Sequence, residues 1–223
     1  MVRARCAVKS ECHPGRRPGG RPSKEEAERL GAKILDGARA VFGTKGIGHA
    51  SLDEIASELG VSKHTIYRRY PGKAALLDAV VGRDIARFRQ ALVAAGEAGT
   101  EPLDKVRRIA RSYVAFGTAR DYAAFYLSVN AEAAVSPSLR EQLAIWSAAA
   151  LEPLAEAVSV AQGTGVLRPG DSLLARDVLI DLMEGVNNRV RLAAGAIPDV
   201  ERLFEDRWQV FLAAMSTPAD PGR

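Results

Sequence analysis

The spacing of apolar residues is the feature that most constrains the fold of this chain. From about residue 24 onward apolar side chains recur every three or four positions, as in Leu30, Ile34, Ala38 and Val41, and no stretch alternates with a period of two. A repeat near 3.6 residues places an apolar stripe along one side of a helix, whereas half-buried strands need period two. The pattern therefore predicts an all-α fold of about nine helices.

Turn residues separate the expected helices. After the first helix, which Ser23 and Glu26 begin as a capping box, the chain reverses at GTKGIG (43–48); these glycines follow a helix rather than a strand, which favours a turn over a phosphate-binding loop. Further breaks lie at 136–137, 163–165, 169–170 and 195–198. Beyond Lys73 the sequence predicts helices over residues 74–97, 102–118, 122–135, 138–162, 172–194 and 199–215.

Charge is distributed unevenly along the chain. Residues 1–73 carry 15 Lys and Arg against 8 Asp and Glu, whereas residues 74–223 carry 16 against 19. A basic end joined to a mildly acidic body suggests that the first part meets a polyanion. Residues 1–22, rich in Gly, Pro and Arg, are expected to form a flexible basic arm, with a solvated tail that has no partner as the alternative.

Several functional classes lack support in the sequence. Cys6, Cys12 and His13 fall short of the ligands of a zinc site, so we expect no metal and no cofactor. The three histidines lie before residue 65, and neither a Gly-x-Ser-x-Gly elbow nor a His-Glu-x-x-His pair is present, so no catalytic residue is expected. Without an 18-residue apolar run or a signal segment, the chain is expected to be soluble and cytoplasmic.

The stretch from 51 to 73 predicts a helix-turn-helix. Ser51 can cap one short helix, Gly60 can end it, and Ser62 can cap a second helix that runs to Tyr70. With Ile66 facing the core, the other side chains of the second helix project outward, where a major groove admits one α-helix. The alternative is a charged solvent face of an ordinary helix.

The run SLDEIASELGVSKHTIYRRYPGKAALLDAV resembles the DNA-binding domain of the TetR family of bacterial transcriptional repressors. The pattern is carried by Ile55-Ala56, Gly60-Val61-Ser62, Thr65-Ile66-Tyr67 and Lys73, and Phe42 with Gly46 fits the end of the family's first helix. Tyr70 stands where Phe is usual, Arg69 where His or Tyr is common and His64 where a small residue or Pro is common. The operator sequence therefore does not carry over.

The resemblance implies a homodimer that places two recognition helices in successive major grooves of a palindromic operator. Thr65, Tyr67 and Lys73 would hold the DNA backbone, and Lys63, His64 and Arg68 would lie nearest the bases. The basic arm would reach the minor groove, with nonspecific electrostatic affinity as the alternative. The full set of predicted DNA-binding residues is Ser51, Ser62, Lys63, His64, Thr65, Tyr67, Arg68, Arg69, Tyr70, Lys73, Arg16, Arg17 and Arg21.

The C-terminal part resembles the ligand domains of AcrR- and AefR-like members of that family, through FYLSVNAEA, GVLRPGD and a helix that ends in LAAG. This implies a domain that binds a small, largely apolar effector and dimerises through its last two helices. Aromatic and polar residues on the middle helices are the predicted effector site, although buried aromatics commonly serve only as core: Tyr113, Phe116, Phe125, Tyr126, Asn130, Trp146, Met183 and Asn187.

Apolar stripes on the last two helices predict the dimer interface, with the protomer core as the alternative: Val178, Leu182, Val186, Val190, Phe204, Trp208 and Phe211. The expected organisation is an arm (1–22), a helix-turn-helix domain (23–73), an effector and dimerisation domain (74–216) and a tail (217–223). The function predicted is a ligand-responsive repressor that binds double-stranded DNA. The alternatives are a ligand-independent architectural DNA-binding protein and an enzyme with an incidental helix-turn-helix.

Overall fold

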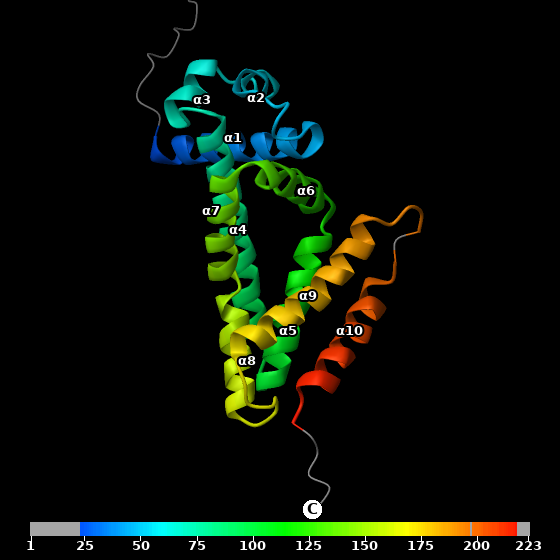
Figure 1. Cartoon of the computed structure of the whole chain (residues 1–223). Helices are drawn as coiled ribbons and strands as arrows, with labels where there is room; N and C mark the ends of the chain where they lie inside the picture. Colours follow the sequence, from blue (N-terminus) through cyan, green and yellow to red (C-terminus); the bar gives the residue numbers. More distant parts are fainter. Residues whose placement is uncertain (1–22, 197, 218–223) are drawn as a thin grey trace, which may run out of the picture.

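A computed structural model describes residues 23–196 and 198–217, and the predicted all-α class is confirmed. Figure 1 shows α1, α2 and α3 at one end of the molecule and the long α4 running from them toward the other end. The predicted arm, with Arg16, Arg17 and Arg21, lies outside the described residues. Ten helices occur in the described part: α1 (Lys24–Lys45), α2 (Leu52–Leu59), α3 (Lys63–Arg69), α4 (Lys73–Glu97), α5 (Pro102–Thr118), α6 (Arg120–Val135), α7 (Pro137–Ala150), α8 (Glu152–Gly163), α9 (Ser172–Arg191) and α10 (Val200–Met215).

Serine side chains begin the first three helices as the sequence indicates. The Ser23 hydroxyl accepts from the Glu26 N–H and the Glu26 carboxylate accepts from the Ser23 N–H, which completes the capping box. The Ser51 and Ser62 hydroxyls accept from the N–H groups three residues later, at 3.2 and 3.1 Å. Gly60 ends α2 with φ +63°, a left-handed conformation that suits glycine. These caps fix the short corner between α2 and α3.

Two apolar clusters form the core, and the first one joins the N-terminal helices to α6 and α7. Ile34, Phe42, Ile55 and Ile66 are fully buried in it together with Phe125 of α6. At Gly43 of α1 an added Cβ would come within 3.4 Å of the backbone nitrogen of residue 125, so α1 and α6 approach closely. The second cluster lies among α4, α5, α8, α9 and α10.

The predicted helix over residues 138–162 is two helices, because the chain breaks at Leu151. Pro153 lies in the first turn of α8, where its missing N–H costs nothing, but the same residue inside a continuous helix would remove a hydrogen bond and clash with the preceding turn. The α7 and α8 axes are bent by 43°. Among the described residues no single helix is long and apolar enough to cross a membrane. Only α7 and α8 taken together reach that length and apolar composition, and they are bent at their junction.

The stripes predicted as a dimer interface are largely core. Phe204, Trp208, Phe211 and Val186 are buried within one chain, where the Trp208 ring stacks on Phe204 and Phe211 at centroid distances of 6.3 and 5.6 Å. Val178, Leu182 and Val190 keep partial exposure. Four of the seven residues therefore belong to the protomer core, the alternative to a dimer interface. Helical periodicity marks the buried side of a helix, but it does not tell whether the same chain or a second copy covers that side.

Candidate DNA-binding surface and ligand cavity

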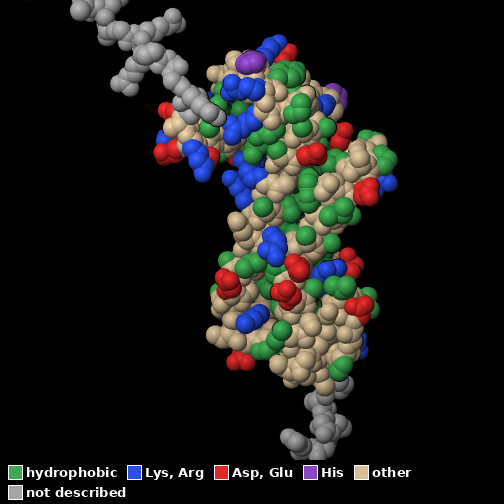
Figure 2. Space-filling model, turned by 90° about the vertical axis from the view of Figure 1, so that its left-hand side faces the viewer, with side chains coloured by type: hydrophobic (Ala, Val, Ile, Leu, Met, Phe, Trp, Pro, Cys, Tyr) green, Lys and Arg blue, Asp and Glu red, His purple; other side chains and the backbone are tan. Residues whose placement is uncertain are grey.

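Helix α3 presents most of the predicted DNA-binding side chains to solvent. Ile66 is fully buried, whereas Lys63, His64 and Arg68 are exposed, and Tyr67 keeps 48% of its surface exposed. Thr65 and Tyr70 are half-buried, and Tyr70 packs against the first apolar cluster. On the face seen in Figure 2, Lys and Arg side chains gather over the N-terminal helices. The surface can meet a polyanion as the sequence predicts.

Two cations on α3 have partners within the chain. The Lys63 ammonium donates to the Asp53 carboxylate at 2.5 Å, and this hydrogen bond raises the pKa of Lys63. The Arg69 guanidinium donates to the Ala27 carbonyl of α1 at 2.9 Å. Gly31 leaves room for that guanidinium, because an added Cβ would lie 2.8 Å from its Nη2 atom. Arg69 therefore braces α3 against α1, a structural role beyond the predicted DNA contact.

Lys73 also has a structural role. Its ammonium donates to the carbonyl oxygens of Ile47 and Gly48 at 2.8 and 3.1 Å. These bonds tie the turn after α1 to the first residue of α4. The carbonyls are neutral, so the ammonium keeps its charge near the helix-turn-helix, and its predicted phosphate contact stays a prediction.

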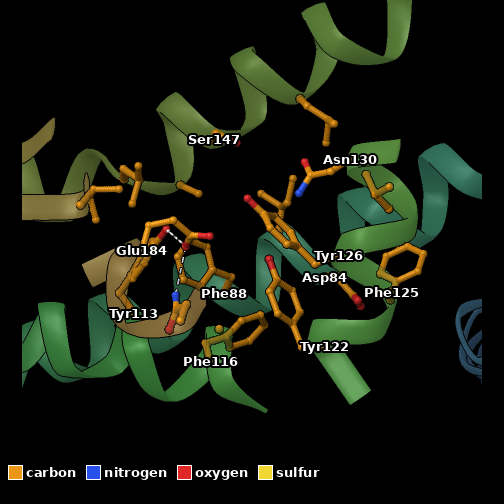
Figure 3. Close-up of a pocket in the computed structure, with 18 of the residues that line it drawn as sticks. Asp84, Phe88, Tyr113, Phe116, Tyr122, Phe125, Tyr126, Asn130, Ser147 and Glu184 are labelled. Carbon is orange, nitrogen blue, oxygen red and sulfur yellow. Dashed lines mark hydrogen bonds between the residues drawn. The ribbon is translucent and has the colours of Figure 1, made fainter. Parts of the chain in front are cut away.

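A cavity of about 340 Å³ lies among α4, α5, α6, α7 and α9. Figure 3 shows labelled aromatic side chains surrounding it from several helices. Neighbouring rings are in contact: Phe88 lies 5.7 Å from Tyr113 and 5.0 Å from Phe116, and Tyr122 lies 4.5 Å from Phe116 and 5.7 Å from Tyr126 between ring centroids. The volume and the aromatic walls fit a small-molecule site.

Six of the eight residues predicted for the effector site line this cavity: Tyr113, Phe116, Phe125, Tyr126, Asn130 and Asn187. The other two do not. Met183 is fully buried in the second apolar cluster, and Trp146 packs against the first cluster near Gly82. Both are apolar and lie on the predicted helices, and the sequence pattern cannot separate a core position from a cavity wall.

The sequence pattern did not predict the charged groups of the cavity, Asp84, Asp181, Glu184 and Arg191. One signal was present. Asp84 follows Leu77, Val80 and Val81 on the apolar side of α4, where a carboxylate is unexpected unless it is paired.

Glu184 is the centre of a polar cluster on one wall. Its carboxylate accepts from the Tyr113 hydroxyl at 3.0 Å and from the Asn187 amide at 3.1 Å, and it forms an ion pair with Arg191. The Arg191 guanidinium also lies over the Tyr126 ring, 5.1 Å from its centroid. Burial, followed by the nearby Glu184 charge, raises the pKa of Tyr113, so its phenol remains a hydrogen-bond donor at neutral pH.

Asp84 links the cavity to the DNA-binding helices. This cavity-lining carboxylate accepts from the Arg39 Nε atom of α1 at 2.5 Å, and the two side chains are only 6% and 17% exposed. The Arg39 guanidinium also lies 5.7 Å from the centroid of Phe125, a second cavity residue. Cavity residues therefore contact α1 directly.

Tyr122 lies in the same cavity wall. Burial, followed by the charges of Tyr126 and Asp84, raises the pKa of Tyr122.

The chain has recognisable relatives among regulators of transcription. SrpR of Pseudomonas putida is 38% identical over 61 residues, a match that spans 27% of this chain and 29% of SrpR. UidR of Escherichia coli K12 is 26% identical over 168 residues, 72% of this chain and 81% of UidR. Both are HTH-type transcriptional regulators, which supports the expectation that this chain is not an enzyme.

Solved structures share the fold over most of the chain. A protein from Saccharomonospora viridis described as a transcriptional regulator, in complex with choline, superimposes with a TM-score of 0.73 at 20% identity over 85% of this chain and 99% of that one. The flavonoid-responsive regulator FrrA gives 0.67 at 24% identity, over 86% and 100% of the two chains.

The N-terminal helices carry the most specific match. The family model described as "Bacterial regulatory proteins, tetR family" matches residues 34–80, which include the whole of α2 and α3. Together with the relatives and the shared fold, this match supports the interpretation of the chain as a transcriptional regulator of the TetR family.

Proposed function

We propose that this chain is a homodimeric repressor that binds a palindromic operator and leaves it when a small molecule fills the cavity. In this proposal residues 23–73 form the DNA-binding domain and residues 74–216 the effector and dimerisation domain. In this proposal the protein binds DNA in a bacterial cell, so its proposed location is the cytoplasm. The observation that carries it is the contact of Asp84 and Phe125, two cavity residues, with Arg39 of the DNA-binding end.

The DNA contact in the proposal centres on the exposed side of α3. His64, Tyr67 and Arg68 are exposed and have no side-chain hydrogen bond within the described part of the chain. An arginine can donate two hydrogen bonds to guanine in the major groove, whereas a tyrosine hydroxyl suits phosphate. The arm with Arg16, Arg17 and Arg21 would add contacts in a minor groove or along the backbone.

A second copy of the chain would pack on the outer side of α9 and α10. Leu174 and Val210 are 60% and 56% exposed there, and Val178, Leu182 and Leu203 are half-buried beside them. These residues are spaced as one side of each helix, at the margin of the core that contains Trp208 and Phe211. We call this surface the outer α9–α10 face. It replaces the core residues in the predicted interface.

Two outward-facing valines provide a test of this dimer. Val210→Arg on α10 is expected to leave folding intact and to convert the dimer into monomer, measured by light scattering after gel filtration. Val160 on α8 is 54% exposed, so Val160→Arg is the matched control and should remain dimeric. A Val210→Arg variant that stays dimeric would exclude the outer α9–α10 face.

A two-state equilibrium can join the cavity to DNA binding. A ligand favours the state that it binds more tightly, so it must change contacts that differ between the two states. Movement of α4 or α6 around a ligand would shift Asp84 and Phe125, and with them Arg39 and α1. In the dimer this would alter the separation of the two α3 helices, which has to match half-sites about 34–36 Å apart or a multiple of that.

Selection of binding sites from random duplex DNA by the purified full chain tests the proposal. We expect an enriched palindrome, and compounds that fill the cavity should release the protein from it. An enriched site that no cavity-binding compound affects would favour the ligand-independent DNA-binding protein. Recovery of no enriched sequence at low salt would contradict the proposal as a whole.

A further inference from the structure

The ionised groups of the cavity are mostly carboxylates. Asp84, Asp181 and Glu184 line it, against Arg191 as the single lining cation in the described part of the chain. The Arg191 side chain is only 3% exposed, whereas that of Glu184 is 27% exposed and Asp181 is an exposed residue. Asp181 forms no ion pair within the described residues. A ligand that enters therefore meets negative charge first.

The chain's own arginines show that this environment stabilises a cation. Arg191 lies over the Tyr126 ring and pairs with Glu184, and Arg39 lies near the Phe125 ring and pairs with Asp84. Each site combines one aromatic ring with one carboxylate, which is the combination that attracts organic cations. The faces of Phe88, Phe116 and Tyr122 extend this surface for an apolar body.

A buried acceptor lies beside these carboxylates. Asn187 is 1% exposed, and its Oδ1 atom has no hydrogen-bond partner within the described residues. The amide is held in place by its bond to Glu184 and by Gly117, where an added Cβ would lie 2.3 Å from Nδ2. Asp181, Glu184 and Asn187 follow one another at three-residue intervals along α9, and their carboxylate oxygens and the Asn187 Oδ1 atom are hydrogen-bond acceptors.

We infer that the effector is an organic cation, a protonated amine with an aromatic or other apolar body, whose ammonium meets Asp181 and Glu184 while its body packs on the aromatic walls. This inference rests on the proposed effector function of the cavity and specifies the class of ligand. An anionic ligand would face the carboxylates directly, and a neutral one would gain no ion pair with Asp181.

Three compounds of nearly equal shape separate the charge states: tryptamine is a cation at neutral pH, tryptophol is neutral and indole-3-acetate is an anion. Titration calorimetry of the purified full chain should give binding in that order, with tryptamine at least about tenfold tighter than tryptophol. Equal affinities of tryptamine and tryptophol, tighter binding of indole-3-acetate, or no binding of tryptamine would overturn the inference.

Variants of the two accessible carboxylates locate the charge. Asp181→Asn is expected to reduce the preference for tryptamine over tryptophol to a few-fold while leaving tryptophol binding unchanged. Glu184→Gln should act in the same direction and is the second variant, since it also alters the bonds of Tyr113 and Arg191. Asp177→Asn is the control, because Asp177 lies one turn earlier on α9, pairs with Arg176 and does not line the cavity. An unchanged preference in both cavity variants would contradict the site.

Operator binding in the same preparations separates this inference from the proposed function. A chain that binds its selected operator, yet binds tryptamine and tryptophol equally, remains a regulator and refutes the cationic ligand. A chain that prefers tryptamine but selects no operator supports the cationic site and refutes the regulator. The two failures are therefore distinguishable.

Discussion

Helix α3 and the ligand cavity present ionised side chains of opposite sign. On α3 itself the exposed ionised side chains are cations, notably Arg68 and Lys63, whereas in the cavity the accessible ionised side chains are carboxylates, notably Glu184 and Asp181. DNA would thus be recognised by residues of α3, and a cationic ligand by residues of α9. We therefore expect that DNA binding and ligand binding can be altered by separate substitutions. The exception is the ion pair between Asp84 of the cavity and Arg39 of α1.

The largest expected effect tests whether the C-terminal region is held by its own core. Trp208→Ala should lower the free energy of unfolding by about 3–5 kcal/mol, because it removes a buried ring stacked between Phe204 and Phe211. Urea denaturation at several protein concentrations measures it. Val160→Ala on α8, which is 54% exposed and lies outside the proposed dimer interface, is the control and should change stability by less than about 0.5 kcal/mol. If the loss in Trp208→Ala disappeared at high protein concentration, Trp208 would belong to an interface after all.

The next effect addresses the contact that joins the two ends. Asp84→Asn should destabilise the chain by about 1–3 kcal/mol, since it weakens a nearly buried ion pair. A double-mutant cycle with Arg39→Gln should give a coupling energy in the range of about 0.5–3 kcal/mol. Asp36→Asn is the control: Asp36 pairs with Arg83 but is 60% exposed, so its loss should cost less than about 1 kcal/mol. If the effects of Asp84→Asn and Arg39→Gln on the free energy of unfolding were additive, the proposed coupling between the cavity and α1 would be contradicted.

Two adjacent arginines sharpen the account of the α3 end. Arg68→Ala should relax preference at one operator position by about 1–3 kcal/mol, because its guanidinium is free to meet a base. Arg69→Ala should instead lower stability by about 0.5–1.5 kcal/mol through loss of the bond to the Ala27 carbonyl. Site selection and thermal denaturation on both variants distinguish these outcomes. An unchanged motif for Arg68→Ala would refute its assignment to the bases.

The smallest expected effect concerns Lys63, whose ammonium is held by Asp53. Asp53→Asn frees this cation and removes a negative charge near DNA, so operator affinity should rise by less than about tenfold at low salt and return toward the wild-type value as salt increases. Fluorescence anisotropy with a labelled operator measures it. Asp206→Asn on α10 changes the net charge equally and should leave affinity unchanged. Weaker binding of Asp53→Asn would mean that Asp53 positions Lys63 for its contact.

The N-terminal helices could be predicted closely because their signals are local. A serine cap, a glycine with positive φ and apolar residues within one turn act over a few positions, so Ser51, Gly60 and Ser62 have the structural places that their spacing indicates. The break at Leu151 also has a local signal in Pro153, but the predicted helix over residues 138–162 ran through it.

The C-terminal region depends on contacts between distant residues, which periodicity does not encode. Phe204 and Trp208 were predicted for the dimer interface from their spacing, but they are buried in the core. Met183 was predicted for the effector site as an apolar residue of a middle helix, and it too is buried in the core. Likewise Glu184 and Asp84 are ordinary acidic residues in the sequence, and only packing brings them to the cavity. The partners of Arg69 and Lys73 are backbone carbonyls far along the chain, which no side-chain pattern reveals.

The most direct test of the account is the effect of tryptamine on operator affinity, measured by fluorescence anisotropy for the wild type and for Arg39→Gln. We predict that saturating tryptamine weakens wild-type binding about fivefold or more, and that Arg39→Gln binds both operator and tryptamine with little effect of one on the other. Operator affinity of the wild type that is the same with and without bound tryptamine would contradict the account.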